Sequence, residues 1–185
     1  NVGGVRQLAD PASGYYAAGI VGNMINCQIL NCYNTGTIIG GYNYTGGIIG
    51  DAHEASNIRG CYNTGSVTGS INTGGIDGII RQTTVTENCY NYGTVTRYDR
   101  SQIGGIVGSV EGNAVVKNCY NAGPMKNIAS IPTGGGSIVG RQDPNITVSN
   151  CYYLDSTIEP ANTGIGGKAD SNTTARQITD AQLQD

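Results

Sequence analysis

Cysteine is the residue type in this chain whose spacing is regular enough to suggest chemistry. Five of the six cysteines are each followed directly by tyrosine and lie 28 to 32 residues apart, namely Cys32, Cys61, Cys89, Cys119 and Cys151. Three arrangements are open to such a set: a column of buried free thiols, one or more disulfides, or a metal site. Zinc needs ligands a few residues apart, and the chain has one histidine. We therefore favour free thiols, with Cys27 as the exception, and expect no metal and no cofactor.

Catalytic residues have little support in the sequence. His53 and Glu54 resemble the start of the metalloprotease motif H-E-x-x-H, but Asn57 stands where the second histidine would be. A cysteine nucleophile activated by His53 lacks any local signature. The acidic residues that could form a glycosidase pair fall at different places in the repeat: Asp51, Glu54, Asp77, Glu87, Asp99 and Glu111. We expect no enzymatic activity, and a carbohydrate-active β-helix enzyme, either a glycoside hydrolase or a polysaccharide lyase, is the alternative.

Tyrosine is the second repeated residue type that could carry function. One follows each repeated cysteine: Tyr33, Tyr62, Tyr90, Tyr120 and Tyr152. Aromatic rings stack on sugars and are frequent in protein interfaces. The series therefore has two interpretations, a surface that binds a glycan or a host surface protein, and a structural stripe that caps one face of the fold.

The elements that position these residues recur with the same period. The stretches "AGIVG", "GGIIG", "GGIDG", "GGIVG" and "GSIVG" each precede a Cys-Tyr pair. Each unit holds three short β-compatible segments bounded by Gly or Asn, and helical periodicity is absent from the units. The sequence therefore predicts an all-β, three-sided parallel β-solenoid of about five coils, because stacked coils can share buried faces that one coil could not stabilise alone.

The repeat also divides the chain. Residues 18–158 hold the solenoid units, residues 1–17 are expected to form a partial coil or cap, and residues 159–185 a linker and possible capping helix. In the last segment Thr174 and Gln177 have the spacing of a helix N-terminus.

The orientation of each side chain follows from the repeat. The isoleucine after each Gly pair is predicted to point inward, whereas the next position, which holds Asp77, is predicted to face solvent because burying a lone carboxylate is costly. A bend with left-handed backbone is expected just before each cysteine, at Asn31, Gly60, Asn88, Asn118 and Asn150. The bend turns the cysteines inward and the tyrosines outward. The amides of Asn31, Asn88, Asn118 and Asn150 are expected to form a ladder from coil to coil.

Composition excludes several partners. The 185 residues carry a net charge of −3, and the 12% of charged residues include no basic cluster, so nucleic acid is not an expected partner. No apolar stretch approaches the roughly 20 residues that cross a bilayer, so membrane insertion is not expected.

The combination of "GGIIG" with "NCYNTGT" and its variants resembles the GLUG repeat of bacterial surface and secreted proteins, which also occurs outside the catalytic domain of some IgA-cleaving peptidases. The resemblance spans roughly residues 3–153. It implies an extracellular location, at the cell surface or secreted, and a role as a stalk or adhesive module covalently linked to flanking domains. The zinc-protease residues of those peptidases are missing, so the resemblance implies no catalytic role.

Overall fold

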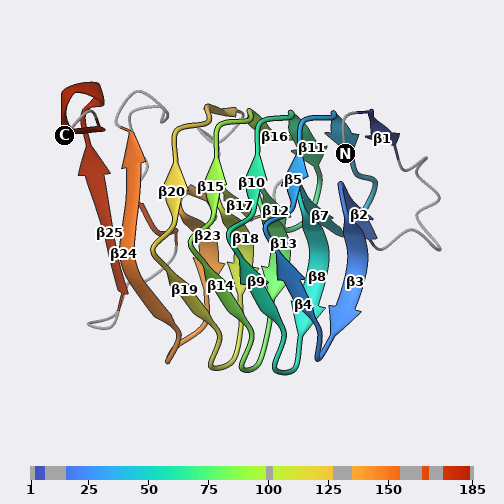
Figure 1. The fold of residues 1–185 in the computed structure, drawn as a ribbon, viewed down its shortest axis with the longest axis horizontal. Coiled ribbons are helices and arrows are strands. Elements are labelled where there is room, and N and C mark those ends of the chain that lie inside the picture. Colours follow the sequence, from blue (N-terminus) through green and yellow to red (C-terminus); the bar gives the residue numbers. More distant parts are fainter. Residues whose placement is uncertain are drawn as a thin grey trace.

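The chain winds into a parallel β-solenoid, which confirms the predicted fold class. The structure, a computed structural model, describes residues 3–6, 16–98, 102–126, 135–154, 164–166 and 173–183. Successive coils lie side by side along the long axis, from the N-terminal coil to the C-terminal one (Figure 1). In the described residues every paired strand runs parallel to its neighbour in the next coil.

Three sheets of the solenoid have five strands each. Sheet A contains β1 (Val5–Arg6), β6 (Ile38–Ile39), β11 (Val67–Gly69), β16 (Val95–Arg97) and β21 (Met125–Lys126). Sheet B contains β2 (Tyr16–Ala18), β7 (Tyr44–Gly46), β12 (Thr73–Gly74), β17 (Ile103–Gly104) and β22 (Gly135–Gly136). Sheet C contains β3 (Val21–Ile25), β8 (Ile49–His53), β13 (Asp77–Ile80), β18 (Val107–Val110) and β23 (Val139–Gln142).

The fourth sheet, sheet D, has two ladders. The first contains β4 (Gln28–Leu30), β9 (Asn57–Arg59), β14 (Val85–Glu87) and β19 (Val115–Lys117). The second contains β5 (Tyr33–Asn34), β10 (Tyr62–Asn63), β15 (Tyr90–Asn91) and β20 (Tyr120–Asn121). The two ladders meet in β24 (Thr147–Leu154), which pairs with both β19 and β20 and also with β25 (Thr173–Ile178).

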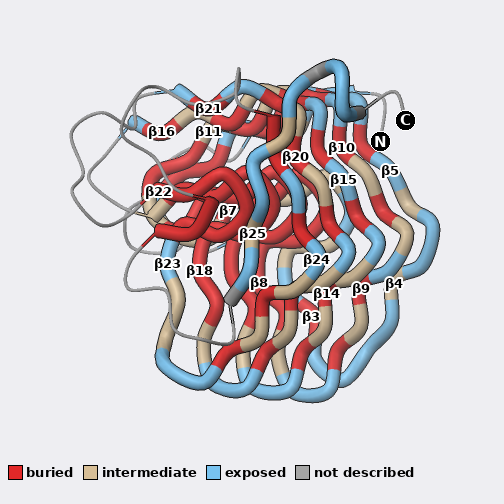
Figure 2. The backbone as a smooth tube through the Cα atoms, turned by 90° about the vertical axis from the view of Figure 1, so that its left-hand side faces the viewer, coloured by how far each residue is buried: buried red, intermediate tan, exposed pale blue. Residues whose placement is uncertain are grey.

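Each coil therefore passes through four sheets and contains five short strands, where the sequence analysis expected three segments. Four complete coils run from β2 to β21, and β22 to β24 continue the winding. Equivalent residues lie directly over one another: Tyr62 pairs with Tyr33 on one side and with Tyr90 on the other. Figure 2 shows this stacking from the end of the solenoid, with buried residues inside the winding.

The main core contains the inward side chains of sheets C and D. It includes the repeated isoleucines Ile48, Ile76, Ile106 and Ile138, all fully buried, together with the buried cysteines. Ile20, the equivalent residue of the first coil, is 38% exposed because no described coil covers it. Two smaller clusters join sheets A and B, one around Ile38 and Val67 and the other around Val95, Ile103 and Met125.

The glycine pair before each isoleucine is required by close backbone approach. A Cβ added to Gly74 would lie 2.0 Å from the Asp77 carbonyl oxygen, and one added to Gly75 would lie 2.2 Å from the Gly105 carbonyl oxygen. Real Cβ atoms do not approach backbone so closely, so this coil requires glycine at both positions of the corner between sheets B and C, whereas the end coils hold Ala18 and Ser137 at one of the two equivalent positions.

The solvent-facing prediction for Asp77 is wrong. Its side chain is fully buried, and its counterparts Ile49, Val107 and Val139 are buried core residues as well. Both this position and the preceding isoleucine point inward because the chain turns at the corner between them, which strict strand alternation did not take into account.

The C-terminal helix prediction is also wrong. Residues Thr173–Ile178 form β25, paired with β24, and only a short 3-10 helix, η2 (Asp180–Leu183), follows. The edge of β24 offers backbone donors and acceptors, and pairing with them outweighs the weak preference of a short segment for helix. Gly164 to Gly166 run beside β23, where Ile165 forms a bridge with Val139. The remainder of the predicted linker, and residues 7–15 of the predicted N-terminal cap, lie outside the described residues.

Within the described ranges, no helix has the length and apolar character needed to cross a membrane.

Candidate binding surface

The bend before each cysteine determines which side chains reach the surface. Its five residues all have positive φ, between 50° and 63°: Asn31, Gly60, Asn88, Asn118 and Asn150. Asparagine and glycine tolerate this left-handed backbone better than other residues. The bend changes the strand phase, so that the cysteine after it points into the core and the following tyrosine points out.

The repeated cysteines form a column of free thiols. All six cysteines of the chain are unbonded, and Cys61, Cys89, Cys119 and Cys151 are buried whereas Cys32, in the first coil, is half-buried. Each repeated thiol donates to the carbonyl oxygen two residues earlier, with Sγ to O distances of 3.2 to 3.4 Å. Burial and the adjacent thiols Cys151 and Cys89 raise the pKa of Cys119, so this thiol stays protonated. Cys27 lies apart from the column and is exposed.

Neither disulfides nor metal ligation is supported by this arrangement. In the described part of the chain, no three His, Cys, Asp or Glu side chains converge to hold a metal ion. The thiols therefore fill a narrow part of the core as small apolar side chains.

The repeated tyrosines form a column on the outer surface. Tyr33 and Tyr62 stack with ring centroids 5.1 Å apart and an interplanar angle of 8°. Tyr62 and Tyr90 stack at 4.9 Å and 1°. The side chains of Tyr33, Tyr90 and Tyr152 are exposed, and those of Tyr62 and Tyr120 are half-buried.

Tyr92 interrupts this regular stack. Its ring meets Tyr90 edge-on, with centroids 5.7 Å apart and planes at 81°, and meets Tyr120 at 5.8 Å and 71°. Tyr92 occupies the middle position of the turn after β15, where the other complete coils have Thr35, Thr64 and Ala122. The sequence analysis did not single out Tyr92, although it is the largest residue in an otherwise small series.

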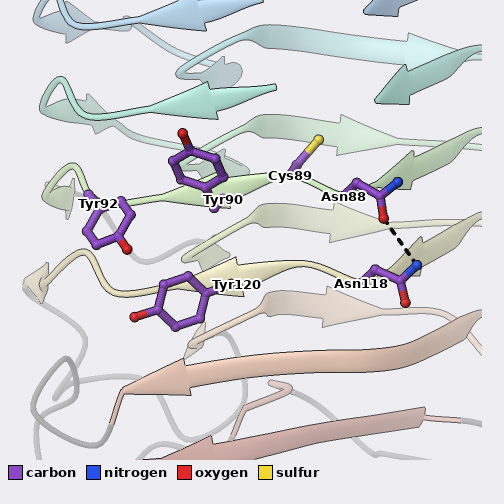
Figure 3. Close-up of a pocket in the computed structure, with 6 residues that line it drawn as sticks. All are labelled: Asn88, Cys89, Tyr90, Tyr92, Asn118 and Tyr120. Carbon is purple, nitrogen blue, oxygen red and sulfur yellow. Dashed lines mark hydrogen bonds between the residues drawn. The ribbon is translucent and has the colours of Figure 1, made fainter. Parts of the chain in front are cut away.

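Two hollows lie beside the interrupted part of the column. The first, of about 360 Å³, is lined by Asn88, Cys89, Tyr90, Tyr92, Asn118 and Tyr120. Figure 3 shows the three tyrosine rings on one side of it and the asparagine pair on the other. The second, of about 470 Å³, is lined by Asn118, Cys119, Tyr120, Asn150 and Tyr152. They share Asn118 and Tyr120, so we call both together the tyrosine groove.

A row of bend asparagines forms the other margin of the tyrosine groove. The Asn118 amide donates to Asn88 Oδ1 at 3.1 Å (Figure 3). The Asn150 amide donates to Asn118 Oδ1 at 3.3 Å. Gly60 stands in this row between Asn31 and Asn88, and it has no side-chain amide to continue the row. Within the predicted ladder, hydrogen bonds therefore join the three asparagines of the groove, Asn88, Asn118 and Asn150, without interruption.

Charged residues precede these bends in the first ladder of sheet D. Lys117 Nζ lies 3.0 Å from Glu87 Oε2, and Arg59 Nε lies 3.7 Å from Glu87 Oε1. Glu87 thus pairs with a cation in the coil on each side of it.

A second asparagine ladder, which the sequence analysis missed, lies behind the tyrosines. Asn34, Asn63, Asn91 and Asn121 are fully buried, and each of the first three donates its amide to Oδ1 of the next at 2.8 or 2.9 Å. Each amide also donates to the carbonyl of the glycine two residues later. The Asn-x-Gly spacing, typical of a side-chain-capped turn, was the signal for this ladder.

Of the carboxylates considered for catalysis, Asp51 and Glu111 share the partner Arg81, whereas Asp77 and Glu87 have other partners. Asp51 is buried and its Oδ2 lies 3.5 Å from Arg81, which also contacts Glu111 at 3.4 Å and covers the Tyr44 ring at 4.9 Å. Burial raises the pKa of Asp51 although Arg81 acts against it. Asp77 accepts a 2.6 Å hydrogen bond from Thr86 in the core. Asp99 lies outside the described residues.

His53 lies near Asn23, with Nε2 to Oδ1 at 3.2 Å. This contact belongs to sheet C, whereas the cysteines of the thiol column lie where the chain passes between the two ladders of sheet D.

Comparisons with known proteins agree with this architecture. The GLUG motif matches residues 99–128. The fold is similar to the crystal structure of a provisionally assigned immunoglobulin A1 protease from Bacteroides ovatus, with 25% sequence identity and a TM-score of 0.65. That similarity covers 84% of this chain and 50% of the other, so the chain spans about half the length of that protein. No curated protein matches the sequence.

Proposed function

We propose that this chain, a structural repeat domain that carries the GLUG motif, serves as a non-catalytic adhesive module of a bacterial surface or secreted protein and binds glycan through the tyrosine groove. The observation that carries the proposal is the meeting of exposed tyrosine rings and exposed asparagine amides along one hollowed strip of the surface. Aromatic faces contact the apolar faces of sugars, and amides bond to their hydroxyl groups. A host surface protein is the other partner that such a surface could take.

The proposal of a non-catalytic role rests on the state of the acidic residues. Asp51 and Glu111, which share one neighbour, are both engaged by Arg81. A glycosidase needs one carboxyl group to give a proton and another to act as base or nucleophile on opposite sides of a sugar bond. Because both carboxylates pair with Arg81, neither is free of a cation for such a role.

The extracellular location and the linkage to further domains are supported by the motif match and by the greater length of the solved relative. The solved relative is twice as long as the aligned part, and it is described as a provisionally assigned immunoglobulin A1 protease. We propose that this chain acts likewise as one segment of a larger exported protein, where it presents the groove at a distance from its anchor.

Binding to an immobilised glycan collection tests this function. We expect the native chain to bind at least one glycan class and Tyr92→Ala to reduce the signal by about tenfold, since stacking of one ring on a sugar is worth about 1–3 kcal/mol by analogy with base stacking. Tyr42→Ala, which changes an equally exposed tyrosine away from the groove, is the matched control and should bind as the native chain does.

Absence of binding to every glycan by the folded native chain would exclude the glycan-binding role. Release of reducing sugar from a polysaccharide panel, lost in Asp51→Asn or Glu111→Gln, would instead support the carbohydrate-active enzyme.

A further inference from the structure

Resting on the glycan-binding function proposed above, we infer that the tyrosine groove selects a linear, uncharged oligosaccharide lying along the solenoid axis, and that Glu87 contributes to the exclusion of acidic glycans by pairing with the neighbouring cations. Four features of the groove support this shape and this charge of the ligand.

The first feature is the direction of the groove. Its two hollows share Asn118 and Tyr120 and together extend over the coils of Tyr90, Tyr120 and Tyr152. These residues pair in consecutive parallel ladders, so they follow one another along the axis about 4.8 Å apart. A ligand that fills both hollows must therefore be elongated in that direction.

The second feature is the repetition of hydrogen-bonding groups. Asn88, Asn118 and Asn150 recur at the coil spacing, and each carries two amide hydrogens and one carbonyl oxygen. In the bonds between them, Asn118 and Asn150 each use one amide hydrogen, which leaves the other to face solvent. The same groups at a regular interval suit a polymer of similar units, such as a chain of sugar rings with hydroxyl groups at each ring.

The third feature is the aromatic wall. Tyr90 is 37% exposed, Tyr92 48% and Tyr152 37%. The Tyr92 ring lies nearly perpendicular to the rings of Tyr90 and Tyr120 and stands edge-on between them. The parallel stacking of the tyrosine rings is therefore interrupted at this point. This is where the first hollow opens, so apolar ring faces of a sugar chain can enter there (Figure 3).

The fourth feature is charge. None of the described residues that line the hollows is charged, and two cations of the first ladder of sheet D, Arg59 and Lys117, both pair with Glu87. The Glu87 side chain is 14% exposed and lies between these two more exposed cations, so it occupies them in ion pairs next to the groove. A carboxylate-bearing glycan would have to compete with Glu87 for Lys117, whereas an uncharged chain disturbs neither pair.

Titration calorimetry against β-linked glucose, mannose and N-acetylglucosamine oligomers of one, three and six rings tests the shape. For the oligomer class that binds, we expect the affinity to rise at least about tenfold from one ring to three and to change less than about threefold from three to six, because the hollows span three coils. A single ring that binds as tightly as three would overturn the elongated ligand.

Oligogalacturonates of the same lengths test the charge. The native chain should bind them at least about tenfold more weakly than the uncharged oligomers, and Glu87→Gln should improve their binding about two- to fivefold without changing the uncharged ligands, the range expected for one partly exposed charge. Glu111→Gln, which removes an equal charge elsewhere, should leave both affinities unchanged. Equal binding of acidic oligomers by the native chain and Glu87→Gln would overturn the role of Glu87.

These outcomes are distinct from failure of the proposed function. If the folded native chain binds neither uncharged nor acidic oligomers, glycan binding itself is excluded, and the selectivity inferred here is excluded with it. Circular dichroism melting of each variant establishes that a lost affinity does not come from unfolding.

Discussion

Asp77 is a carboxyl group inside an apolar core. The equivalent residues of the neighbouring coils, Ile49 and Val107, are hydrophobic, and so are the counterparts of its partner Thr86. Burial raises the pKa of Asp77 well above the usual carboxyl range, and the hydrogen bond from Thr86 only partly opposes this. The folded chain therefore holds the carboxyl proton to a higher pH than the unfolded chain does.

The pH dependence of stability should reveal this proton. Because the folded pKa exceeds the unfolded value of 3.8, the folded state holds a proton that the unfolded state releases as pH rises above that value. The contribution of Asp77 to stability is then complete below that pH and falls by about 1.4 kcal/mol per pH unit until the folded pKa is reached. Asp77→Asn keeps an acceptor for Thr86 and removes the proton.

We expect the free energy of unfolding, measured with denaturant at a series of pH values from acid to neutral, to fall more steeply for the native chain than for Asp77→Asn. Asp51, whose pKa is also raised, is common to both proteins and cancels in the difference. Parallel curves for the two proteins would mean that Asp77 ionises alike in both states.

At the level of single residues, the sequence predicted those whose repetition is exact. The five bend residues, the inward cysteines and the outward tyrosines follow from spacing alone, because stacking forces each letter into one environment. Asp77 and Tyr92 could not be predicted in this way, since each differs from its own series. Their roles depend on the space and the partners that the neighbouring coils provide.

At the level of elements, the bend before Cys61 differs from the others because it has glycine in place of asparagine. Gly60 has φ of 63° and stands between Asn31 and Asn88, which have φ of 54°. A Cβ at position 60 would meet only the end of the Asn31 side chain, at 2.4 Å from Oδ1. That amide can rotate away, so the site can accept a side chain.

Gly60→Asn should therefore stabilise the chain by about 0.5–1.5 kcal/mol. Asparagine tolerates the left-handed backbone, restricts the unfolded chain more than glycine does, and can bond to Asn31 and Asn88. Thermal melting of the variant, compared with Gly60→Ala, measures the effect, and the alanine should destabilise because it has no amide and prefers other backbone angles. A lower midpoint for Gly60→Asn than for the native chain would show that Asn31 cannot move.

The elements themselves were only partly predictable. The glycine pairs and the Cys-Tyr pairs located two corners of each coil, but the split into four sheets depends on how sheets A and B pack around Ile38 and Ile103, which periodicity does not reveal. β25 was predicted as helix because its own residues allow one. Its strand conformation comes from the edge of β24, a partner distant in sequence.

At the scale of the whole molecule, the two ends of the solenoid differ. In the first coil Ile25 and Leu30 are 47% and 49% exposed, and among the described residues β2 to β5 pair on one side only. At the other end, β25 covers β24 and Ile165 runs beside β23. Coils at the first end have fewer neighbours to stabilise them, so opening of the structure should begin there.

Pulling on the two termini of single molecules would measure how the coils separate. We expect the coils to detach one after another, with each of 28 to 32 residues adding about 90–115 Å of extended chain. Optical-trap extension curves should therefore contain several steps of similar size. One step that releases the whole chain would contradict coil-by-coil separation.

The reason lies in the orientation of the backbone hydrogen bonds, which join one coil to the next and so point along the direction of the load. All coils carry the same tension, so the coil with the fewest neighbours yields first, and the molecule lengthens in stages at low force. In the adhesive role proposed above, a tether built from such a segment would lengthen under a sudden flow. The opening of one coil would dissipate energy while the remaining coils stay intact.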